Sequence, residues 1–308
     1  MILVAGENLI DFIPLNKNKY NYYVGGSALN TAVALGRLET NVYFCSQISK
    51  DFFGTTILSY LINNKVKTSK IKFSNYNSTI AIVVNKKKPD FNIYTKDTAS
   101  INFKDYILDQ KTLSEIKLAH FSSIGLALKP SSNTFLKLIK DIKKNKKSII
   151  SFDPNIRATI IKDKSYFIKT FKKILNFSDI VKMSDEDFKY LSKQDFSKQI
   201  RNWIEKYSIK LFILTLGAQG SIAYTKTNKI IQKNKKIKIS DTVGAGDTFI
   251  AGIIKYLDYT KSLNLKKLDV ISYNDLKKCL FFATKVAEQN CVKEGCDPPY
   301  LKKVEKFI

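Results

Sequence analysis

Short apolar runs alternate along the chain with longer segments in which apolar residues recur every three or four positions. A short apolar run bounded by polar residues predicts a buried strand, and the longer spacing predicts an amphipathic helix. Strands are expected at residues 2–5, 42–48, 118–124, 148–152, 180–183 and 211–216. Helices are expected at residues 27–38, 53–63, 132–144, 166–175 and 196–207. This alternation is typical of an α/β protein with a mostly parallel, doubly wound sheet flanked by helices.

One stretch breaks the alternation. Residues 79–84 and 91–94 have the composition of strands, and the polar link 85–90 between them contains Pro89. They predict a hairpin inserted into the α/β body, which is either a small β lid over a site or an ordinary edge hairpin. The sequence has no internal repeat and no low-complexity linker. We therefore expect a single domain over residues 1–308, with lid strands from about 12–24 and 73–100.

The composition excludes several classes of protein. The chain has 308 residues, 44% of them hydrophobic and 12% aromatic, which favours a folded globule over a disordered chain. No apolar run approaches the roughly 20 residues that a membrane helix needs, and residues 1–11 carry two acids and no base, unlike a secretory signal. The four cysteines form no CxxC pair, so neither a zinc ribbon nor a disulfide scaffold is indicated. We expect a cytoplasmic protein.

The net charge of +25 raises the possibility of a nucleic-acid partner. However, only three of the 52 basic residues are arginine, the side chain best suited to base edges and phosphates. The lysines are dispersed, so we favour a solvated lysine surface and expect neither a nucleic-acid nor a membrane partner. The sole histidine, His120, lies in a predicted strand and is expected to be packed there.

The segment 241–249 (DTVGAGDTF) is the sharpest chemical feature. It precedes a helix expected from about Asp247 to Tyr259. The small residues let the backbone N–H groups of Gly244, Ala245 and Gly246 approach an anion, and the helix amino terminus adds partial positive charge. Asp247 could then take a proton from a hydroxyl while the N–H groups hold a transferring phosphoryl group. The alternative is that Asp247 is only the N-cap of the helix after a tight turn.

Other polar and glycine positions have both a binding and a structural interpretation. Asp11 could accept hydrogen bonds from hydroxyls or close a turn, and Asn30 could bind a ligand or start a helix. Residues 153–157 (DPNIR) follow a predicted strand, where open α/β sheets bind ligands. The turn 215–220 (TLGAQG) could line a nucleotide or be only a turn. The sequence contains neither GxxxxGK[ST] nor a GxGxxG after the first strand, so Walker-A and NAD-binding proteins are disfavoured.

These segments, in order, resemble the ribokinase-like (PfkB) carbohydrate and nucleoside kinases. Residues 241–249 are similar to the second signature of that family, and residues 25–38 (GGSALNTAVALGRL) to its amino-terminal signature. Residues 6–14, 151–157, 181–187, 215–220 and 290–299 resemble bacterial fructokinases in particular. The resemblance spans essentially the whole chain and implies the ribokinase-like fold.

The resemblance implies an ATP-dependent sugar kinase acting on a primary hydroxyl, with D-fructose giving fructose 6-phosphate as the first expectation. Asp247 would be the catalytic base and the amides of Gly244, Ala245 and Gly246 the anion hole. The sugar-binding residues implied are Asp11, Gly25, Gly26, Asn30, Tyr94, Asn155 and Arg157. The nucleotide-binding residues implied are Lys182, Ser184, Thr215, Gly217 and Gly220, together with Gly244 and Gly246. The alternatives are a 2-keto-3-deoxygluconate kinase, with Arg157 or Lys96 near the substrate carboxylate, and a basic nucleic-acid-binding protein on this fold.

The family pattern also implies metal ions, and the sequence departs from it at two places. Ser184-x-x-Asp187 replaces the usual Asn-x-x-Glu, so Asp187 could hold Mg²⁺ through water, or Glu186 and Asp187 could be solvated helix acids. The lid reads Ile93-Tyr94-Thr95 and Thr98-Ala99-Ser100, without the arginine and aspartate frequent in fructokinases; Lys96 and Asp97 could compensate. The residues implied for a monovalent cation such as K⁺ are Asp241, Val243, Asn290, Lys293 and Gly295. Relatives are often dimers joined through lid strands, which edge strands near residues 80–84 would permit.

Overall fold

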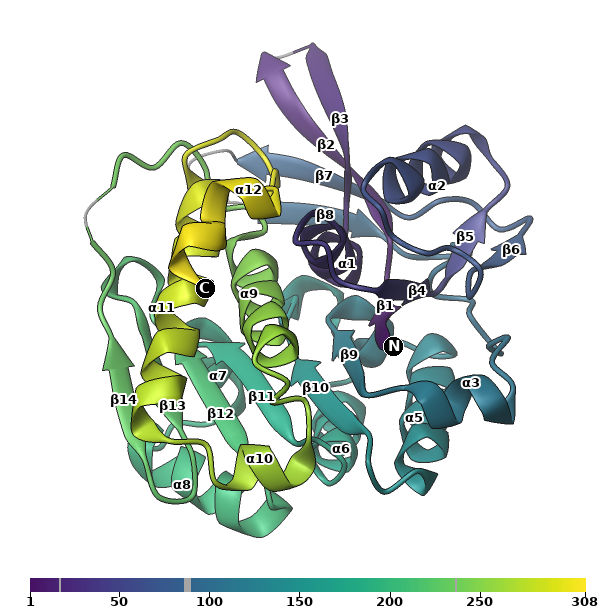
Figure 1. Ribbon diagram of the computed structural model, residues 1–308. Coiled ribbons are helices and arrows are strands. Elements are labelled where there is room, and N and C mark those ends of the chain that lie inside the picture. Colours follow the sequence, from purple (N-terminus) through teal and green to yellow (C-terminus); the bar gives the residue numbers. More distant parts are fainter. Residues whose placement is uncertain (17, 86–89, 236) are drawn as a thin grey trace.

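A mostly parallel sheet forms the centre of the protein (Figure 1). The computed structural model describes residues 1–308 except 17, 86–89 and 236. The strand order of the main sheet is β14-β13-β12-β11-β10-β9-β1-β4, in which the last six strands are parallel and β13 and β14 are antiparallel. The strands are β1 (Ile2–Gly6), β4 (Val42–Cys45), β9 (Leu118–Ser122), β10 (Ile149–Asp153), β11 (Ile180–Ser184), β12 (Leu211–Thr215), β13 (Ser221–Tyr224) and β14 (Lys229–Gln232). The six parallel strands are those predicted from the apolar runs.

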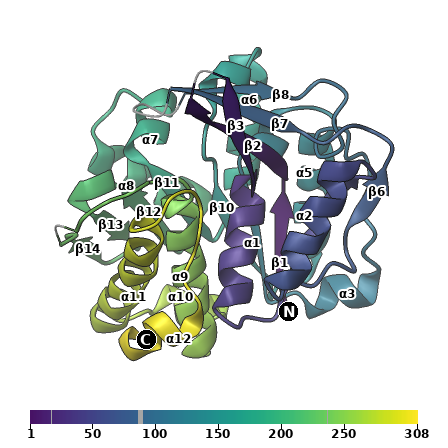
Figure 2. The same ribbon diagram turned by 90° about the horizontal axis from the view of Figure 1, so that it is seen from above.

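Helices cover both faces of this sheet (Figures 1 and 2). One face packs against α1 (Ser27–Arg37), α2 (Phe52–Asn63), α9 (Ala245–Tyr259), α10 (Leu265–Asp269), α11 (Tyr273–Cys291) and α12 (Leu301–Val304). The other packs against α3 (Gln110–Glu115), α4 (Ile124–Ala127), α5 (Ser131–Lys144), α6 (Lys164–Leu175), α7 (Asp185–Leu191) and α8 (Phe196–Tyr207). Strand β1 shows why its run is continuously apolar, because Ile2 and Val4 enter one core and Leu3 and Ala5 the other.

A separate four-stranded sheet stands beyond the carboxyl end of β1 (Figure 1). Its order is β3 (Lys19–Gly25), β2 (Leu9–Asn16), β7 (Ile80–Asn85) and β8 (Asp90–Tyr94). The predicted hairpin therefore belongs to a lid-like sheet and is not an edge hairpin of the main sheet. The link 86–89, with Pro89, lies outside the described residues. The suggestion that residues 80–84 form a free edge was wrong, because β7 lies between β2 and β8 and the edges are β3 and β8.

The predicted strand 42–48 is divided in two. It ends in the main sheet at Cys45 and resumes as β5 (Gln47–Ser49), which pairs with β6 (Lys72–Ser74) in a small third sheet. The break falls at Ser46, whose hydroxyl donates to the Gly6 carbonyl at 2.6 Å and accepts from Asn8 at 2.9 Å. These side-chain bonds replace ladder bonds at the point where the chain changes direction.

His120 lies within β9 and is completely buried. Its Nδ1 is 2.9 Å from the Ser151 hydroxyl on the neighbouring strand. Burial lowers the pKa of His120 to about 3, with a smaller contribution from Lys182, so the ring is neutral at physiological pH. As the sequence indicated, it is a packed strand histidine. Among the described helices, none is both long enough and apolar enough to cross a membrane.

Candidate active site

Helix α9 begins with the segment that the sequence singled out. It starts at Ala245 with Gly244 as N-cap, two residues earlier than predicted, so Asp247 lies inside the first turn and is not the N-cap. Gly244 has φ +71, a left-handed conformation that favours glycine, and a side chain there would collide with Cys296. The Ala245 N–H donates to the Thr242 carbonyl at 3.1 Å, whereas the N–H groups of Gly244 and Gly246 have no acceptor among the described residues. The amides that remain available to an anion at this turn are therefore those of the two glycines.

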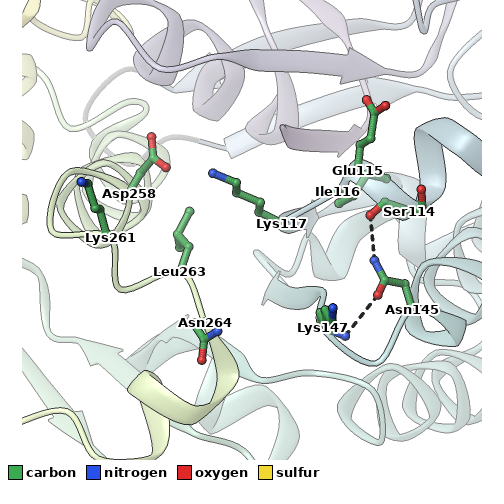
Figure 3. A pocket seen from close by; sticks show the side chains of 10 residues that line it. All are labelled: Ser114, Glu115, Ile116, Lys117, Asn145, Lys147, Asp258, Lys261, Leu263 and Asn264. Carbon is green, nitrogen blue, oxygen red and sulfur yellow. Dashed lines mark hydrogen bonds between the residues drawn. The ribbon is translucent and has the colours of Figure 1, made fainter.

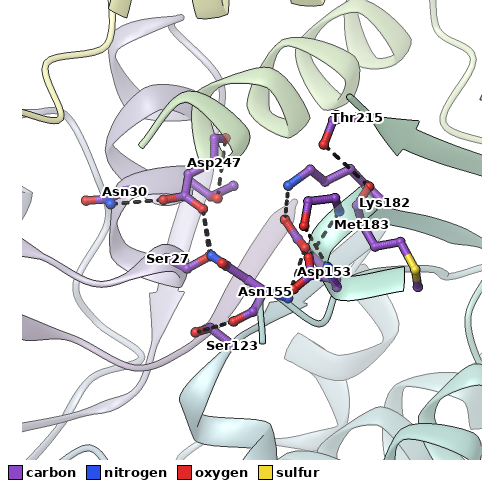
Figure 4. Close-up of polar contacts among 12 residues, drawn as sticks. Ser27, Asn30, Ser123, Asp153, Asn155, Lys182, Met183, Thr215 and Asp247 are labelled. Atoms are coloured by element: carbon purple, nitrogen blue, oxygen red, sulfur yellow. Dashed lines mark hydrogen bonds and ion pairs between the residues drawn. The ribbon is translucent and has the colours of Figure 1, made fainter. Parts of the chain in front are cut away.

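Asp247 is buried, with 5% of its surface exposed, and both of its carboxylate oxygens accept hydrogen bonds (Figure 4). Ser27 Oγ donates to Oδ1 at 2.7 Å, and Asn30 Nδ2 donates to Oδ2 at 2.9 Å. Asn155 Nδ2 reaches Oδ1 from the other side at 3.4 Å. Three segments, α1, α9 and the loop after β10, thus meet at one carboxylate. Such a fixed carboxylate beside free amides can take a proton while an anion is held.

The loop after β10 carries Asn155 and Arg157 to this point. Asn155 has φ +36, and its N–H donates to Asp153 Oδ1 at 3.2 Å. Arg157 Nη1 donates to Asn155 Oδ1 at 2.6 Å. The Ile156 N–H donates to Asp187 Oδ1 at 2.7 Å, which ties the loop to α7. The loop conformation is therefore fixed by two buried carboxylates.

Lys182 lies beside the amino terminus of α9. A Cβ atom added to Gly246 would lie 2.7 Å from Lys182 Nζ. The same Nζ forms an ion pair with Asp153 Oδ2 at 2.7 Å, and both side chains are almost fully buried (Figure 4). Burial alone would lower the pKa of Lys182, but Asp153, Asp187 and Asp247 raise it above its usual value. A permanent positive charge thus stands next to the candidate anion hole.

Ser184 and Asp187 form a reciprocal capping box at the start of α7. Asp187 N–H donates to Ser184 Oγ, and Ser184 N–H donates to Asp187 Oδ2, both at 3.0 Å. Asp187 is 6% exposed, so it is not a solvated helix acid, whereas Glu186 is exposed. Ser184 pairs with Thr215 across β11 and β12, which brings the glycine turn that follows Thr215 to the same edge of the sheet.

That turn contains Gly217 and Gly220 and leaves open space at its tip. A Cβ atom on Gly217 would meet no atom within 4 Å, although its φ of +54 favours glycine. The Gly220 N–H donates to the Gly217 carbonyl at 3.1 Å, which closes a single 3-10 turn. The turn follows Thr215, whose hydroxyl reaches the Met183 carbonyl at 3.4 Å. The nucleotide residues implied by the motifs therefore line one edge from β11 to α9.

Asp11 lies on the inner face of the lid sheet and lines a cavity of ≈ 330 Å³. On the neighbouring strand β3, Gly25 lies two residues from Tyr23, the partner of Asp11, and a side chain at Gly25 would collide with the Asp11 carboxylate. Burial raises the pKa of Asp11 to about 7; Arg157 opposes this shift, and Asp247 and Glu7 add to it. The other lining residues are Ile13, Tyr23, Val24, Arg37, Tyr60, Val83, Phe91, Val243, Glu294, Gly295, Cys296 and Asp297.

Tyr94 is not brought to this cavity. In the lid sheet it pairs with Ile80, which pairs with Ile10, so it shares their face. Asp11 is one residue further along β2 and therefore points to the opposite face. The Tyr94 side chain is 58% exposed, and Lys96 and Asp97 are exposed beyond it. The residues that β7 and β8 contribute to the cavity are apolar, namely Val83 and Phe91.

The residues implied for a monovalent cation come together between the loop before α9 and the loop after α11. Asp241 accepts from the N–H groups of Val243 at 3.0 Å and Gly295 at 2.9 Å. Asn290 Nδ2 donates to the Val243 carbonyl at 2.8 Å, and Lys293 N–H donates to the Asn290 carbonyl at 3.2 Å. Asn290 Oδ1 is buried and has no partner among the described residues.

Arg37 fixes this carboxyl-terminal loop to the body. It donates to the Pro298 carbonyl and to Asn64 Oδ1, both at 2.6 Å, and forms an ion pair with Asp297. The aromatic ring of Tyr300 lies 5.0 Å from its guanidinium carbon. An arginine of the amino-terminal signature therefore holds the last loop in place.

Two contact residues escaped the sequence analysis, Ser27 and Glu7. The Ser27 hydroxyl binds Asp247, and its backbone N–H donates to Glu7 Oε1 at 2.8 Å. Ser27 lies inside the GGSALN segment, and its hydroxyl was the available signal. Glu7 lies directly after the first predicted strand, where ligand-binding groups are common.

A larger cavity, of ≈ 550 Å³, lies at the opposite edge of the sheet (Figure 3). It is lined by Asp258 at the far end of α9, by Lys117 before β9 and by Lys261. No site residue implied by the sequence lines it.

Comparison with known proteins decides the family. The model of the pfkB family carbohydrate kinases matches residues 1–303. The chain belongs to this family. A fructokinase of Rhizobium leguminosarum bv. trifolii is 34% identical over 275 residues, covering 87% of this chain and 83% of that protein.

Solved structures of this family share the fold. Xylella fastidiosa fructokinase with bound ATP gives a TM-score of 0.89 at 21% identity, covering 100% of this chain and 97% of that one. A double mutant of Vibrio cholerae fructokinase with bound fructose, ADP and potassium ion gives 0.86 at 23% identity, covering 99% and 97%. The ribokinase-like fold and the carbohydrate kinase activity inferred from the motifs are thereby confirmed.

Proposed function

We propose that this carbohydrate kinase transfers the γ-phosphoryl group of ATP to the 6-hydroxyl of D-fructose. The observation that carries the proposal is the Asp247 carboxylate, which is held by α1 beside the free amides of α9. Among relatives, the proposal is supported by the Rhizobium fructokinase and by the fructokinase structures with bound ATP or with bound fructose and ADP. Fructose would lie in the cavity that Asp11 lines, and ATP would lie along the turn that contains Gly217 and Gly220.

In this mechanism the sugar hydroxyl replaces the long contact from Asn155 beside Asp247 and gives its proton to the carboxylate. The hydroxyl oxygen forms a bond to the γ-phosphorus as the bond from that phosphorus to the ADP oxygen breaks. The amides of Gly244 and Gly246 donate to the transferring group, and Lys182 offsets its charge. Closure of the lid sheet over the sugar would exclude water and limit ATP hydrolysis.

The sugar would lie between the lid and the start of α1. Asp11 would accept from sugar hydroxyls, and Asn30, Asn155 and Arg157 would donate to sugar oxygens. Gly25 and Gly26 let the backbone approach. We leave Tyr94 out of this set because its face of the lid points away. The nucleotide would lie along the edge formed by Lys182, Ser184, Thr215, Gly217 and Gly220.

Two kinds of metal ion fit the chain. Mg²⁺ would neutralise the ATP phosphates, and the buried Asp187 could hold it through water, because each of its oxygens accepts only one backbone N–H bond. K⁺ would add positive charge beside the anion hole. The unpartnered Asn290 Oδ1 and the carbonyls of Val243, Lys293 and Gly295 are suitable oxygen ligands, with the Asp241 carboxylate nearby.

A second substrate, 2-keto-3-deoxygluconate, is favoured by one observation. Within the described part of the chain, Arg157 forms no ion pair with a carboxylate, yet it lies at the site through its bond to Asn155. Its guanidinium could bind a substrate carboxylate bidentately.

The decisive experiment is ADP release from Mg-ATP with fructose, ribose, 2-keto-3-deoxygluconate or no sugar. We expect release that depends on fructose and that rises when K⁺ replaces Na⁺. A signal with the keto-acid alone would keep the mechanism and contradict the assignment of fructose. Equal release with and without every sugar would contradict sugar phosphorylation, and equal rates in the two salts would contradict the K⁺ site.

We also propose that two copies pair through their lid sheets. Tyr20, Tyr22 and Tyr94 are 47%, 46% and 58% exposed, and the strand register places all three on the same face of the lid. An exposed aromatic face of this kind is typical of an interface. We expect twice the mass of one chain by light scattering and a single chain for Tyr22→Asp. Tyr259→Asp, an exposed tyrosine on α9, is the matched control; a monomeric wild type would contradict the pairing.

A further inference from the structure

Glu7 is a buried acid for which the mechanism above has no use. It follows β1 at the edge where Asp247 lies, and only 1% of its surface is exposed. Its Oε1 accepts from the Ser27 N–H at 2.8 Å. Its Oε2 is buried and has no hydrogen-bond partner among the described residues. The chain closes tightly over it, since a Cβ atom on Gly26 would lie 3.0 Å from the Glu7 carbonyl oxygen.

The contact with Ser27 replaces a missing cap. Gly26 is the N-cap of α1 and has no side chain to bind the first free N–H groups of the helix. Glu7 supplies an oxygen to the first of them from another segment. The hydroxyl of the same Ser27 donates to Asp247 Oδ1 at 2.7 Å. Glu7 therefore binds the backbone N–H of Ser27, and Asp247 binds the hydroxyl of the same residue.

The surroundings of Glu7 oppose a negative charge. An ionised carboxylate here would leave one charged oxygen unpaired in the interior, which is strongly unfavourable. The charged groups that face it are Asp247 from α9, Asp11 from β2 and Arg157 from the loop after β10. Burial raises the pKa of Glu7 to about 7; Asp247 adds to this shift, while the N–H groups of Glu7 and Ser27 and the charge of Arg157 oppose it.

We propose that Glu7 is a positioning residue that, as a neutral acid, fixes the amino end of α1 and through Ser27 holds the Asp247 carboxylate for the sugar hydroxyl. The inference rests on the proposed function. Loss of the Glu7 proton places a further negative charge beside Asp247, where the anionic ATP must arrive. Free enzyme with ionised Glu7 is therefore the less competent form.

The test compares kcat/KM for ATP between pH 5.5 and 9 in wild type, Glu7→Gln and Glu7→Ala. Gln has the shape of the neutral acid and cannot ionise. Relative to Glu7→Gln, we expect wild type to lose about tenfold per pH unit above pH 7. Glu7→Ala should lower kcat about 100-fold at every pH, because the base is misplaced. The loss in kcat caused by Glu7→Ala should be smaller when Ser27 is already alanine, because Glu7 acts on Asp247 through the Ser27 hydroxyl.

Glu39→Gln, an exposed acid at the other end of α1, is the matched control and should keep the wild-type profile. A Glu7→Gln profile identical to wild type, or full kcat in Glu7→Ala, would overturn the proposal.

Melting temperature gives a readout that needs no sugar. The folded state holds the proton up to about pH 7 and the unfolded chain only to about 4.5, so wild type loses stability as pH rises between these values.

Between pH 5 and 8 we expect wild type to lose on the order of 5 °C relative to Glu7→Gln. A chain that phosphorylates no sugar but shows this shift would contradict the proposed function and still support the neutral acid. Full sugar kinase activity with no shift and no difference in pH profile would overturn Glu7 alone.

Discussion

Asp247→Ala should lower kcat by about 10³-fold or more, while the affinity for ATP stays within about threefold. A positioned general base typically contributes 10²–10⁴-fold, and the neighbouring acids are not placed to take over the proton. Asp11 lies on the lid sheet, and Glu7 is buried against the Ser27 N–H. ADP release with the accepted sugar and equilibrium binding of a fluorescent ATP analogue measure the two quantities separately.

Two further variants test whether that loss comes from the missing proton acceptor and not from a disturbed helix. Asp247→Asn keeps the shape of the side chain and its neighbours Ser27 and Asn30, so it should be equally inactive although it folds. Asp258→Ala removes a partly buried acid from the far end of the same helix and should change kcat by less than twofold. Wild-type turnover in Asp247→Ala would remove Asp247 from the mechanism.

Lys182→Met should have the largest effect on stability. Removing one partner of a buried ion pair leaves an uncompensated charge, here on Asp153, and typically costs about 3–5 kcal/mol of the free energy of unfolding. It should also lower kcat about 100-fold, the effect of removing one group that stabilises the transferring anion. Urea unfolding and sugar-dependent ADP release measure these losses.

Adding Asp153→Asn to Lys182→Met separates the two roles. The double variant no longer buries an unpaired charge and should recover much of the stability, but the kinase should stay slow because the cation is still absent. Lys189→Met breaks an exposed pair with Asp185 and should cost less than about 0.5 kcal/mol. Recovery of both stability and rate in the double variant would mean that Lys182 is only structural.

The sequence predicted the parallel core of the sheet because strands buried on both faces read as unbroken apolar runs. It missed β13 and β14, which are only four residues long each, and α11, the longest of the described helices. The signal for α11 was present, since Leu276, Cys279, Leu280 and Ala283 recur at helical spacing and are buried. Intervening lysines and aromatic residues hid this stripe.

Site residues that belong to a contiguous motif could be predicted from the sequence. Residues that meet only because the chain folds could not. Asp247 and the two glycines follow from one string, and they lie together at the start of α9. Tyr94, which the resemblance implied for the sugar, lies on the face of the lid opposite Asp11, because one residue of register in a strand inverts the direction of the side chain. Glu7 and Ser27 meet across 20 residues, a contact that no local pattern contains.

The bond between Ser27 and Asp247 joins positions 220 residues apart. Arg37 similarly reaches Asp297, 260 residues further along. A ribosome must therefore complete nearly the whole polypeptide before the two halves of this site can meet. A nascent chain that ends before residue 247 lacks the carboxylate that we propose as the base, so such a product should not phosphorylate sugar. Contacts of such long sequence separation also slow folding, and the newly made chain should acquire activity later than its secondary structure.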